Sequence, residues 1–215
     1  MPAASTKTAD HDGATFCGTG FSWRSQAPAG LSDPAIGDRH RATPTSPRKI
    51  PHRCRKKILA LCPGAEYGPA KRWPAGHFAA VANAKIGEGW QVWLFGSDKD
   101  RPVADAIVEL TGGVCRNFVG ETTLAEAVDL LALADAVVSN DSGLMHVAAA
   151  LDKKIVAVYG SSDPGFTPPL NPAAQILSLK LACSPCFKRD CPFGHTRCLT
   201  ELGPEQVLAA LEADR

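Results

Sequence analysis

The stretch from residue 139 to residue 150 combines residue types that can hold an anion. Asp141 or Ser142 is placed to cap a helix, because a short side-chain oxygen accepts hydrogen bonds from the free N–H groups of a first turn. Gly143 carries no Cβ and lets a ligand approach the backbone. The free N–H groups and the positive end of the helix dipole favour an anion such as a diphosphate. His146 follows about one turn after Ser142, so it can face the same ligand.

An ordinary corner between a strand and a helix fits the same residues. The apolar residues 136–138 before it are typical of a buried parallel strand. On that interpretation Asp141 or Ser142 is only a helix cap, and His146 is a surface or core histidine. The choice depends on which other loops lie beside this corner.

Four cysteines form a second group with chemical potential: Cys183, Cys186, Cys191 and Cys198. Thiolates at this density can bind zinc tetrahedrally, and a cluster in a cytosolic chain is more often a metal site than a disulfide framework. The gaps of two, four and six residues differ from the common arrangement of two C-x2-C pairs. Reduced thiols in a loop, or an adventitious disulfide, therefore fit as well as a structural zinc, and we expect no catalytic metal there.

Apolar runs and turn residues predict the elements that position these groups. The Thr123 to Glu126 segment matches a capping box, and apolar positions at helical spacing follow it. We expect strands at 58–62, 90–95, 114–119, 136–138, 155–159 and 175–181, and helices at 74–85, 102–110, from 123, from 142 and from 204. This alternation implies right-handed βαβ units, and hence an α/β fold with a mainly parallel sheet covered by helices on both faces.

Three polar loops follow predicted strands of that sheet: residues 63–73, 96–100 and 140–146. In open parallel sheets, ligands bind beyond the carboxyl ends of the strands. Because the three loops meet at that edge, they indicate a nucleotide site.

Composition divides the chain into two parts. Residues 1–57 carry a formal charge of +6, whereas residues 58–215 carry −5. Residues 1–56 are rich in Pro, Gly, Ser, Thr, Ala and Arg and show no helical or strand period, so we expect a disordered or weakly ordered basic segment. A basic segment can attract nucleic acid or anionic lipid, but no aromatic or helical pattern organises these charges.

Targeting signals are not evident in the sequence. No apolar run approaches the ~20 residues that span a bilayer, so we expect no transmembrane segment. The first residues lack the apolar core of a secretory signal, and a cytoplasmic protein is the expectation.

Three motifs, residues 62–74, 140–150 and 158–164, resemble those of the ADP-heptose:lipopolysaccharide heptosyltransferases of glycosyltransferase family 9. The resemblance covers residues 57–215 and is closest to the heptosyltransferase II members. It implies two Rossmann-like domains facing each other across a cleft. The carboxyl-side domain holds the ADP-sugar, and the amino-side domain holds the acceptor and supplies the base. Residues 57–215 resemble the ADP-sugar-binding domain, and residues 1–56 are too short for a second Rossmann domain.

The resemblance also implies roles for single residues. Lys71 matches a lysine that contacts the donor phosphates, where a cation would stabilise charge developing on the departing ADP. A solvated loop lysine is the alternative. Asp141 matches an acid near the diphosphate and the sugar, and it must face a hydroxyl, a lysine or an N–H group because a carboxylate repels phosphate. Ser142 and Gly143 would present a hydroxyl and amides to the phosphates, with His146 as a further donor.

The remaining site residues are expected around the nucleoside. Asp98 follows the second strand, where an acid reaches a ribose diol in dinucleotide-binding folds, and Asp100 competes for the role. Residues expected to line the same cleft or border the adenine are Gly64, Ala65, Glu66, Glu121 and Thr122.

The resemblance therefore implies an inverting transfer of heptose from ADP-heptose to the lipopolysaccharide inner core, without a required metal. The lipid-linked acceptor implies a cytoplasmic protein that is peripheral to the inner membrane. A non-catalytic nucleotide-binding remnant without an acceptor domain is the main alternative. A zinc-dependent nucleic-acid binder would use the cysteines and the basic segment, but it leaves the three loops unexplained, so we expect no nucleic-acid partner.

Overall fold

The computed structural model describes residues 56–213. The segment predicted to be disordered, residues 1–56, lies outside the described residues except for Lys56. Within residues 56–213, every helix falls short of the length and apolar character that a bilayer crossing requires.

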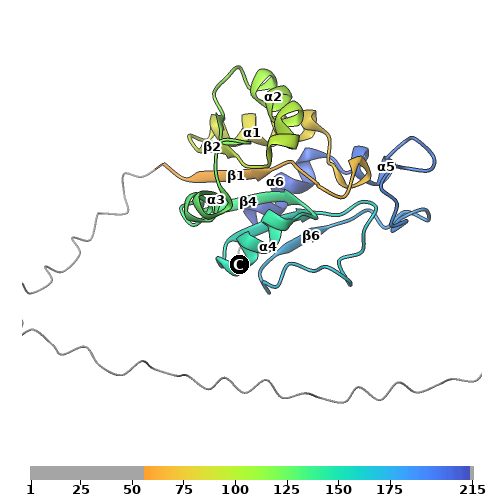
Figure 1. Cartoon of the computed structure of the whole chain (residues 1–215). Helices are drawn as coiled ribbons and strands as arrows, with labels where there is room; N and C mark the ends of the chain where they lie inside the picture. Colours follow the sequence, from red (N-terminus) through yellow and green to blue (C-terminus); the bar gives the residue numbers. More distant parts are fainter. Residues whose placement is uncertain (1–55, 214–215) are drawn as a thin grey trace, which may run out of the picture. The chain divides into compact units, whose positions relative to one another are not determined.

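The described residues form one six-stranded parallel sheet (Figure 1). Its strands are β1 (Ile58–Cys62), β2 (Gln91–Leu94), β3 (Arg116–Asn117), β4 (Ala136–Asn140), β5 (Lys154–Val158) and β6 (Gln175–Leu177). They lie in the order β3-β2-β1-β4-β5-β6, so the two central strands are β1 and β4. Every residue of β1 and β4 is buried, as expected for strands covered on both faces.

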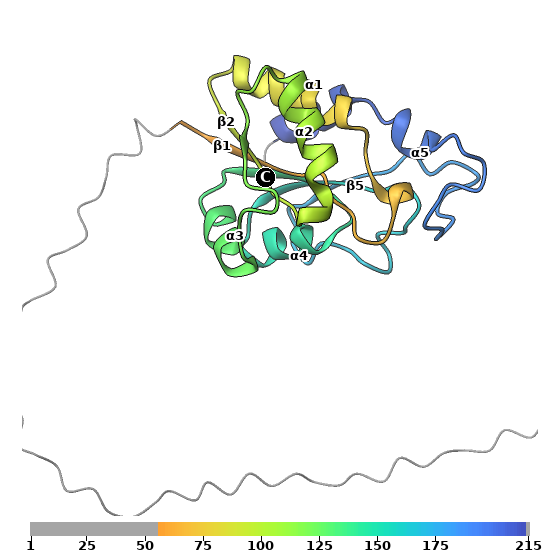
Figure 2. The same ribbon diagram turned by 45° about the horizontal axis from the view of Figure 1, so that its top comes forward.

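Helices cover both faces of the sheet. They are α1 (Ala75–Gly87), α2 (Arg101–Leu110), α3 (Leu124–Leu131), α4 (Gly143–Ala150), α5 (Arg197–Thr200) and α6 (Pro204–Glu212). Figures 1 and 2 show α1 and α2 on one face and α3 and α4 on the other. The α/β class predicted from the sequence is confirmed.

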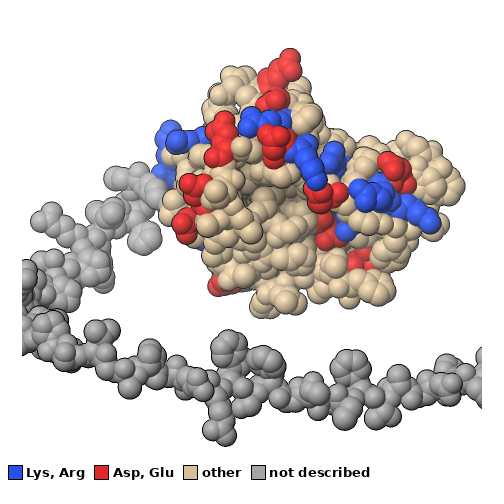
Figure 3. Space-filling model, in the orientation of Figure 1, with Lys and Arg blue, Asp and Glu red and all other residues tan. Residues whose placement is uncertain are grey.

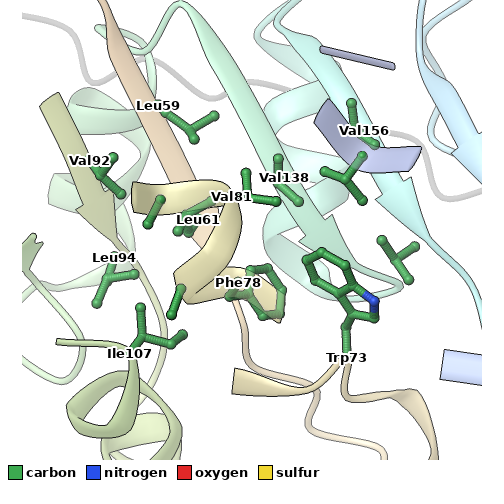
Figure 4. Close-up of a cluster of buried hydrophobic side chains, with 14 of the residues drawn as sticks. Leu59, Leu61, Trp73, Phe78, Val81, Val92, Leu94, Ile107, Val138 and Val156 are labelled. Atoms are coloured by element: carbon green, nitrogen blue, oxygen red, sulfur yellow. The ribbon is translucent and has the colours of Figure 1, made fainter. Parts of the chain in front are cut away.

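Side-chain alternation along the strands builds a separate core on each face. Leu59 and Leu61 of β1 pack with Phe78 of α1 and Ile107 of α2 in one cluster (Figure 4). The intervening Ala60 joins the second cluster, which includes residues of α3 and α4. The two cores fix the sheet between the helix layers and thereby fix the edge where the polar loops emerge.

Local differences from the predicted elements have local causes. The strand expected at 114–119 shortens to two residues, following Gly112 and Gly113, which have positive φ angles. The strand expected at 175–181 ends at Leu177, and Lys180 has a φ of 48°, outside the β region. The sequence analysis missed two short 3-10 helices, η1 (Pro69–Lys71) and η2 (Asp98–Asp100), and also α5.

Candidate nucleotide-sugar site

The predicted polar loops meet at the carboxyl ends of β1, β2 and β4. The strands β2 and β3 follow β1 on one side of the sheet, whereas β4, β5 and β6 lie on its other side, so the strand order reverses between β1 and β4. Open α/β sheets bind their ligands at such a topological switch point. Polar side chains of this edge come from the loop after β1, from η2 and from the start of α4.

A cavity of about 430 Å³ opens at this edge. Its volume lies in the range of small-molecule sites. Among the described residues that line it, none is Lys, Arg or His, whereas Glu66 and Asp100 are acidic. Six predicted site residues line the cavity: Gly64, Ala65, Glu66, Thr122, Ser142 and Gly143. Apolar walls, a few polar groups and the lack of a lining cation suit an uncharged group better than a phosphate.

Asn140, the last residue of β4, joins the end of β4 to the loop after β1. Its buried amide nitrogen donates to the carbonyl oxygen of Pro63 (2.7 Å), and its side-chain oxygen accepts from the backbone N–H of Trp73 (3.0 Å). The Trp73 indole N–H donates in turn to the carbonyl oxygen of Leu202 (2.8 Å). Asn140 thus holds both ends of the loop that carries Lys71. The sequence analysis did not assign it a role, although a polar residue ending a buried strand was a usable signal.

Lys71 and Asp141 form an ion pair at the start of this helix corner. The Lys71 Nζ lies 2.5 Å from Asp141 Oδ2, and both side chains are mostly buried. The ammonium also lies 5.0 Å from the centre of the Tyr67 ring. Asp141 therefore faces a lysine, one of the three partners that the sequence analysis allowed.

Asp141 is also close to the segment after β5. The Thr167 hydroxyl lies 3.4 Å from the Asp141 carboxylate. The buried Tyr159 hydroxyl donates to the carbonyl oxygen of Thr167 (2.5 Å). Burial, and then the charge of Asp141, raise the pKa of Tyr159, so its hydroxyl stays protonated.

The amino end of α4 is open. Ser142 occupies the N-cap position but makes no side-chain cap, and its hydroxyl lies 3.1 Å from that of Ser139. The prediction that Asp141 or Ser142 caps this helix is therefore wrong, because both side chains have tertiary or strand-end partners instead. No described atom outside its immediate neighbours lies within 4 Å of the place where a Cβ of Gly143 would sit. The first-turn N–H groups are left to bind a ligand.

The two acids that competed for the ribose lie in different places. Asp100 is buried, lines the cavity and accepts from the N–H (3.0 Å) and hydroxyl (2.8 Å) of Ser97. It packs against Gly64, where an added Cβ would lie 2.4 Å from an Asp100 oxygen. The Asp98 side chain is 81% exposed and pairs with Arg101 at 2.6 Å, outside the cavity lining.

Other predicted residues lie around the cavity with less contact. Glu66 lines its mouth, and its exposed carboxylate pairs with Lys99 at 2.6 Å, which lowers the pKa of Glu66. Glu121 and His146 are exposed and are not part of the cavity lining. The alternative that His146 is a core histidine is therefore wrong.

The four clustered cysteines are free thiols in and beside the loop between β6 and α6. Within residues 56–213, no group of three or more His, Cys, Asp or Glu side chains is placed to hold a metal ion. Partial burial, and then the charges of Cys183, Cys186 and Cys191, raise the pKa of Cys198.

This loop contacts the segment that carries Lys71. The carbonyl oxygen of Arg189 accepts from the N–H of Ala70 (3.0 Å), and the Arg189 guanidinium lies 5.5 Å from the centre of the Tyr67 ring. An added Cβ at Gly68 would lie 2.6 Å from that same oxygen. The cysteine-rich loop thus supports one side of the site, a role that the sequence analysis did not foresee.

Comparisons with known proteins identify relatives of this chain. A family model described as Glycosyltransferase family 9 (heptosyltransferase) matches residues 24–197, a range that begins upstream of residue 57. Lipopolysaccharide heptosyltransferase 2 of Salmonella typhimurium is 46% identical over 162 residues, which cover 74% of this chain and 47% of that protein. Lipooligosaccharide heptosyltransferase 2 of Haemophilus influenzae is 45% identical over 161 residues, 73% of this chain and 46% of that protein.

A solved structure gives the same result. The structure of E. coli ADP-heptose lps heptosyltransferase II matches with a TM-score of 0.64 and 45% identity, covering 73% of this chain and 45% of that one. The chain spans about half the length of the curated relatives it matches.

Proposed function

Because the chain belongs to glycosyltransferase family 9 (heptosyltransferase), we propose that residues 57–215 form the ADP-sugar-binding half of a heptosyltransferase. The proposed reaction is the inverting transfer of heptose from ADP-heptose to the lipopolysaccharide inner core. The acceptor domain and the base that deprotonates the acceptor hydroxyl lie outside residues 57–215 in this proposal. Because this acceptor is linked to a lipid, the proposed reaction would take place at the cytoplasmic face of the inner membrane.

The separation of charge around the site is the observation that carries the proposal. The cavity has acidic but no basic lining residues among those described, so we assign it the uncharged nucleoside. Asp100 is the acid best placed for the ribose, because it lines the cavity and Asp98 is paired outside it. Thr122 remains the residue proposed to border the adenine, and Glu121 and Asp98 would have to turn inward to contribute.

The diphosphate then belongs beside Lys71 and the amino end of α4. Gly143 and Ser142 both line the cavity at this helix end, and the Asp141 next to them holds the Lys71 ammonium. During transfer, the bond from the anomeric carbon to the diphosphate breaks and negative charge grows on the departing ADP. A lysine and backbone N–H groups aimed at that charge would stabilise it. His146 can join them only by turning toward the ligand.

Calorimetric titration of the full chain with ADP and with ADP-heptose tests this function. We expect saturable binding of both, and a Lys71→Ala variant should bind ADP about tenfold or more weakly, because a charge-assisted contact is lost. Lys154→Ala is the matched control, since Lys154 is the first residue of β5 and lies at the amino end of that strand, whereas the site lies at the carboxyl ends. Failure of the folded wild-type chain to bind ADP would overturn the proposal.

A non-catalytic nucleotide-binding remnant is the second candidate. Both candidates predict ADP binding, so binding does not separate them. A transfer assay in which the acceptor domain of a relative is supplied as a separate chain does. Heptose transfer would support the enzyme, and ADP binding without transfer would support the remnant.

A structural zinc at Cys183, Cys186, Cys191 and Cys198 remains a separate proposal. The thiols as placed within residues 56–213 form no metal-binding group, and what supports the proposal is the density of cysteines between Cys183 and Cys198 in the sequence. Metal analysis of the purified chain decides between zinc and free thiols: one zinc per chain, lost in Cys186→Ser and retained in Cys115→Ser, whose thiol is buried elsewhere, would support the proposal. A folded wild-type chain without zinc would contradict the proposal.

A further inference from the structure

The side chain of Arg72 connects two walls of the nucleoside cavity. Its guanidinium nitrogen Nη2 donates to the carbonyl oxygen of Ala65 (3.3 Å), in the loop after β1. The same nitrogen lies 3.9 Å from Oδ1 of Asp100, the last residue of η2. Ala65 and Asp100 both line the cavity, whereas Arg72 does not. Arg72 therefore reaches the cavity only through two residues that line it.

The two oxygens of the Asp100 carboxylate have different surroundings. Oδ2 accepts from both the backbone N–H and the hydroxyl of Ser97. Oδ1 accepts no hydrogen bond within residues 56–213, because the Arg72 nitrogen at 3.9 Å is too distant to donate one. Oδ1 is thus the oxygen that stays free to accept from a ligand, with a positive charge beside it.

Burial makes that positive charge important for Asp100. The Asp100 side chain is only 10% exposed, and a buried carboxylate without a compensating charge is strongly unfavourable. Among the lysines and arginines that the structure describes, Arg72 alone lies within 4 Å of this carboxylate. Loss of the guanidinium would therefore favour a turn of the carboxylate away from the cavity.

A purely structural role accounts poorly for Arg72. Its Nε is buried, yet this nitrogen has no hydrogen-bond partner in the described part of the chain. An unpaired buried donor costs free energy, and folded proteins nearly always avoid one. The unpaired Nε thus indicates that the contacts of Nη2, rather than overall stability, determine where this side chain lies.

A second arginine makes the same kinds of contact outside the cavity. Arg101 pairs with the carboxylate of Asp98 (2.6 Å) and donates to the carbonyl oxygen of Gly120 (3.2 Å), and neither partner lines the cavity. Figure 3 shows basic and acidic side chains next to one another over the region of α2, so a pair of opposite charges is not unusual on this face. Arg72 differs because both of its partners line the cavity.

We propose that Arg72 is a positioning residue for the ribose of the nucleotide. It keeps Oδ1 of Asp100 turned toward the cavity and holds the Ala65 wall at a fixed place beside it. The inference rests on the proposed function, which assigns the nucleoside to this cavity and its ribose to Asp100. Because such an acid accepts from the ribose 2′-hydroxyl in dinucleotide-binding folds, Arg72 determines how strongly ADP is preferred over 2′-deoxy-ADP.

Calorimetric titration of the full chain with ADP and with 2′-deoxy-ADP tests the proposal, because a general loosening of the fold weakens both ligands alike. The wild-type chain should prefer ADP about tenfold, since a hydrogen bond to a charged acceptor is lost with the hydroxyl. Arg72→Gln should reduce the preference to about twofold or less, and Arg72→Lys, which keeps the charge, should retain most of it. Arg101→Gln is the matched control and should leave the preference unchanged.

A double-mutant cycle separates an effect through Asp100 from a direct contact of Arg72 with the nucleotide. Asp100→Asn alone should abolish the preference, and Arg72→Gln added to it should change the preference no further. If Arg72→Gln does not fold, Arg72→Met repeats the test with an uncharged side chain of similar width. A wild-type preference in the folded Arg72 variant, with ADP binding still dependent on Lys71, would overturn the proposal and leave the proposed function standing.

Discussion

The two sides of the nucleotide-sugar edge hold their polar side chains in different ways. On the β1–β4 side, the partners are far apart in sequence: Lys71 and Asp141 are 70 positions apart, and Asn140 and Pro63 are 77 apart. On the β2 side, the partners are close, because Ser97 and Asp100 are three positions apart and so are Asp98 and Arg101.

This difference separates two structural roles. Long-range ties form only when the sheet is assembled, since each closes a long loop of chain. They set the position of the Lys71 loop, to which we assign the phosphate chemistry. The short-range ties shape η2 locally and give the nucleoside cavity one of its walls.

The largest expected effect on stability comes from removing the long-range hydrogen bonds of the Asn140 side chain. Asn140→Ala should lower the free energy of unfolding by about 2–4 kcal/mol, because the Trp73 N–H and the Pro63 carbonyl lose a buried partner. Urea denaturation measures this change. Asn83→Ala, which removes one exposed amide contact to Leu110, should change it by about 0.5 kcal/mol or less. Equal effects of the two substitutions would show that the long-range tie contributes little.

A smaller effect is expected on the short-range side. Asp100→Ala should lower the free energy of unfolding by about 1 kcal/mol through the lost cap at Ser97, and it should weaken ADP binding. Asp98→Ala should leave both stability and ADP binding unchanged, because its ion pair with Arg101 is exposed. Denaturation and calorimetry of the two variants give the comparison. ADP binding that depends on Asp98 and not on Asp100 would restore the ribose role first predicted for Asp98.

The smallest effect should appear within the ion pair itself. Asp141→Asn should tighten ADP binding about threefold, because it removes a negative charge beside the diphosphate and frees the Lys71 ammonium. Calorimetric titration beside the wild-type chain measures the change. Weaker ADP binding by Asp141→Asn would mean that Asp141 acts mainly by positioning Lys71.

The same contrast explains what the sequence revealed. The capping box from Thr123 to Glu126 is confirmed because both partners lie in one helical turn. The parallel sheet is confirmed because apolar runs and turn residues are also local signals. The Lys71–Asp141 contact was not predicted, since no local pattern pairs residues so far apart and the family resemblance gave the two residues separate roles.

Competing side-chain partners, one local and one distant in sequence, account for the failed capping prediction. Ser142 does not cap α4 because its hydroxyl lies beside that of Ser139, and Asp141 does not because it holds Lys71. Sequence patterns therefore predicted the elements well, and among the side-chain partners they predicted the Thr123–Glu126 capping box but not the contacts of Ser142 and Asp141.

A crystal structure of the full chain with ADP would test the central claim most directly. We expect the adenosine in the cavity between the loop after β1 and the start of α3, with diphosphate oxygens bonded to Lys71 Nζ and to the Gly143 N–H. ADP bound in the groove beside Trp90, at the amino ends of the strands, would contradict the account. So would a diphosphate placed among the acidic residues of the cavity, away from Lys71.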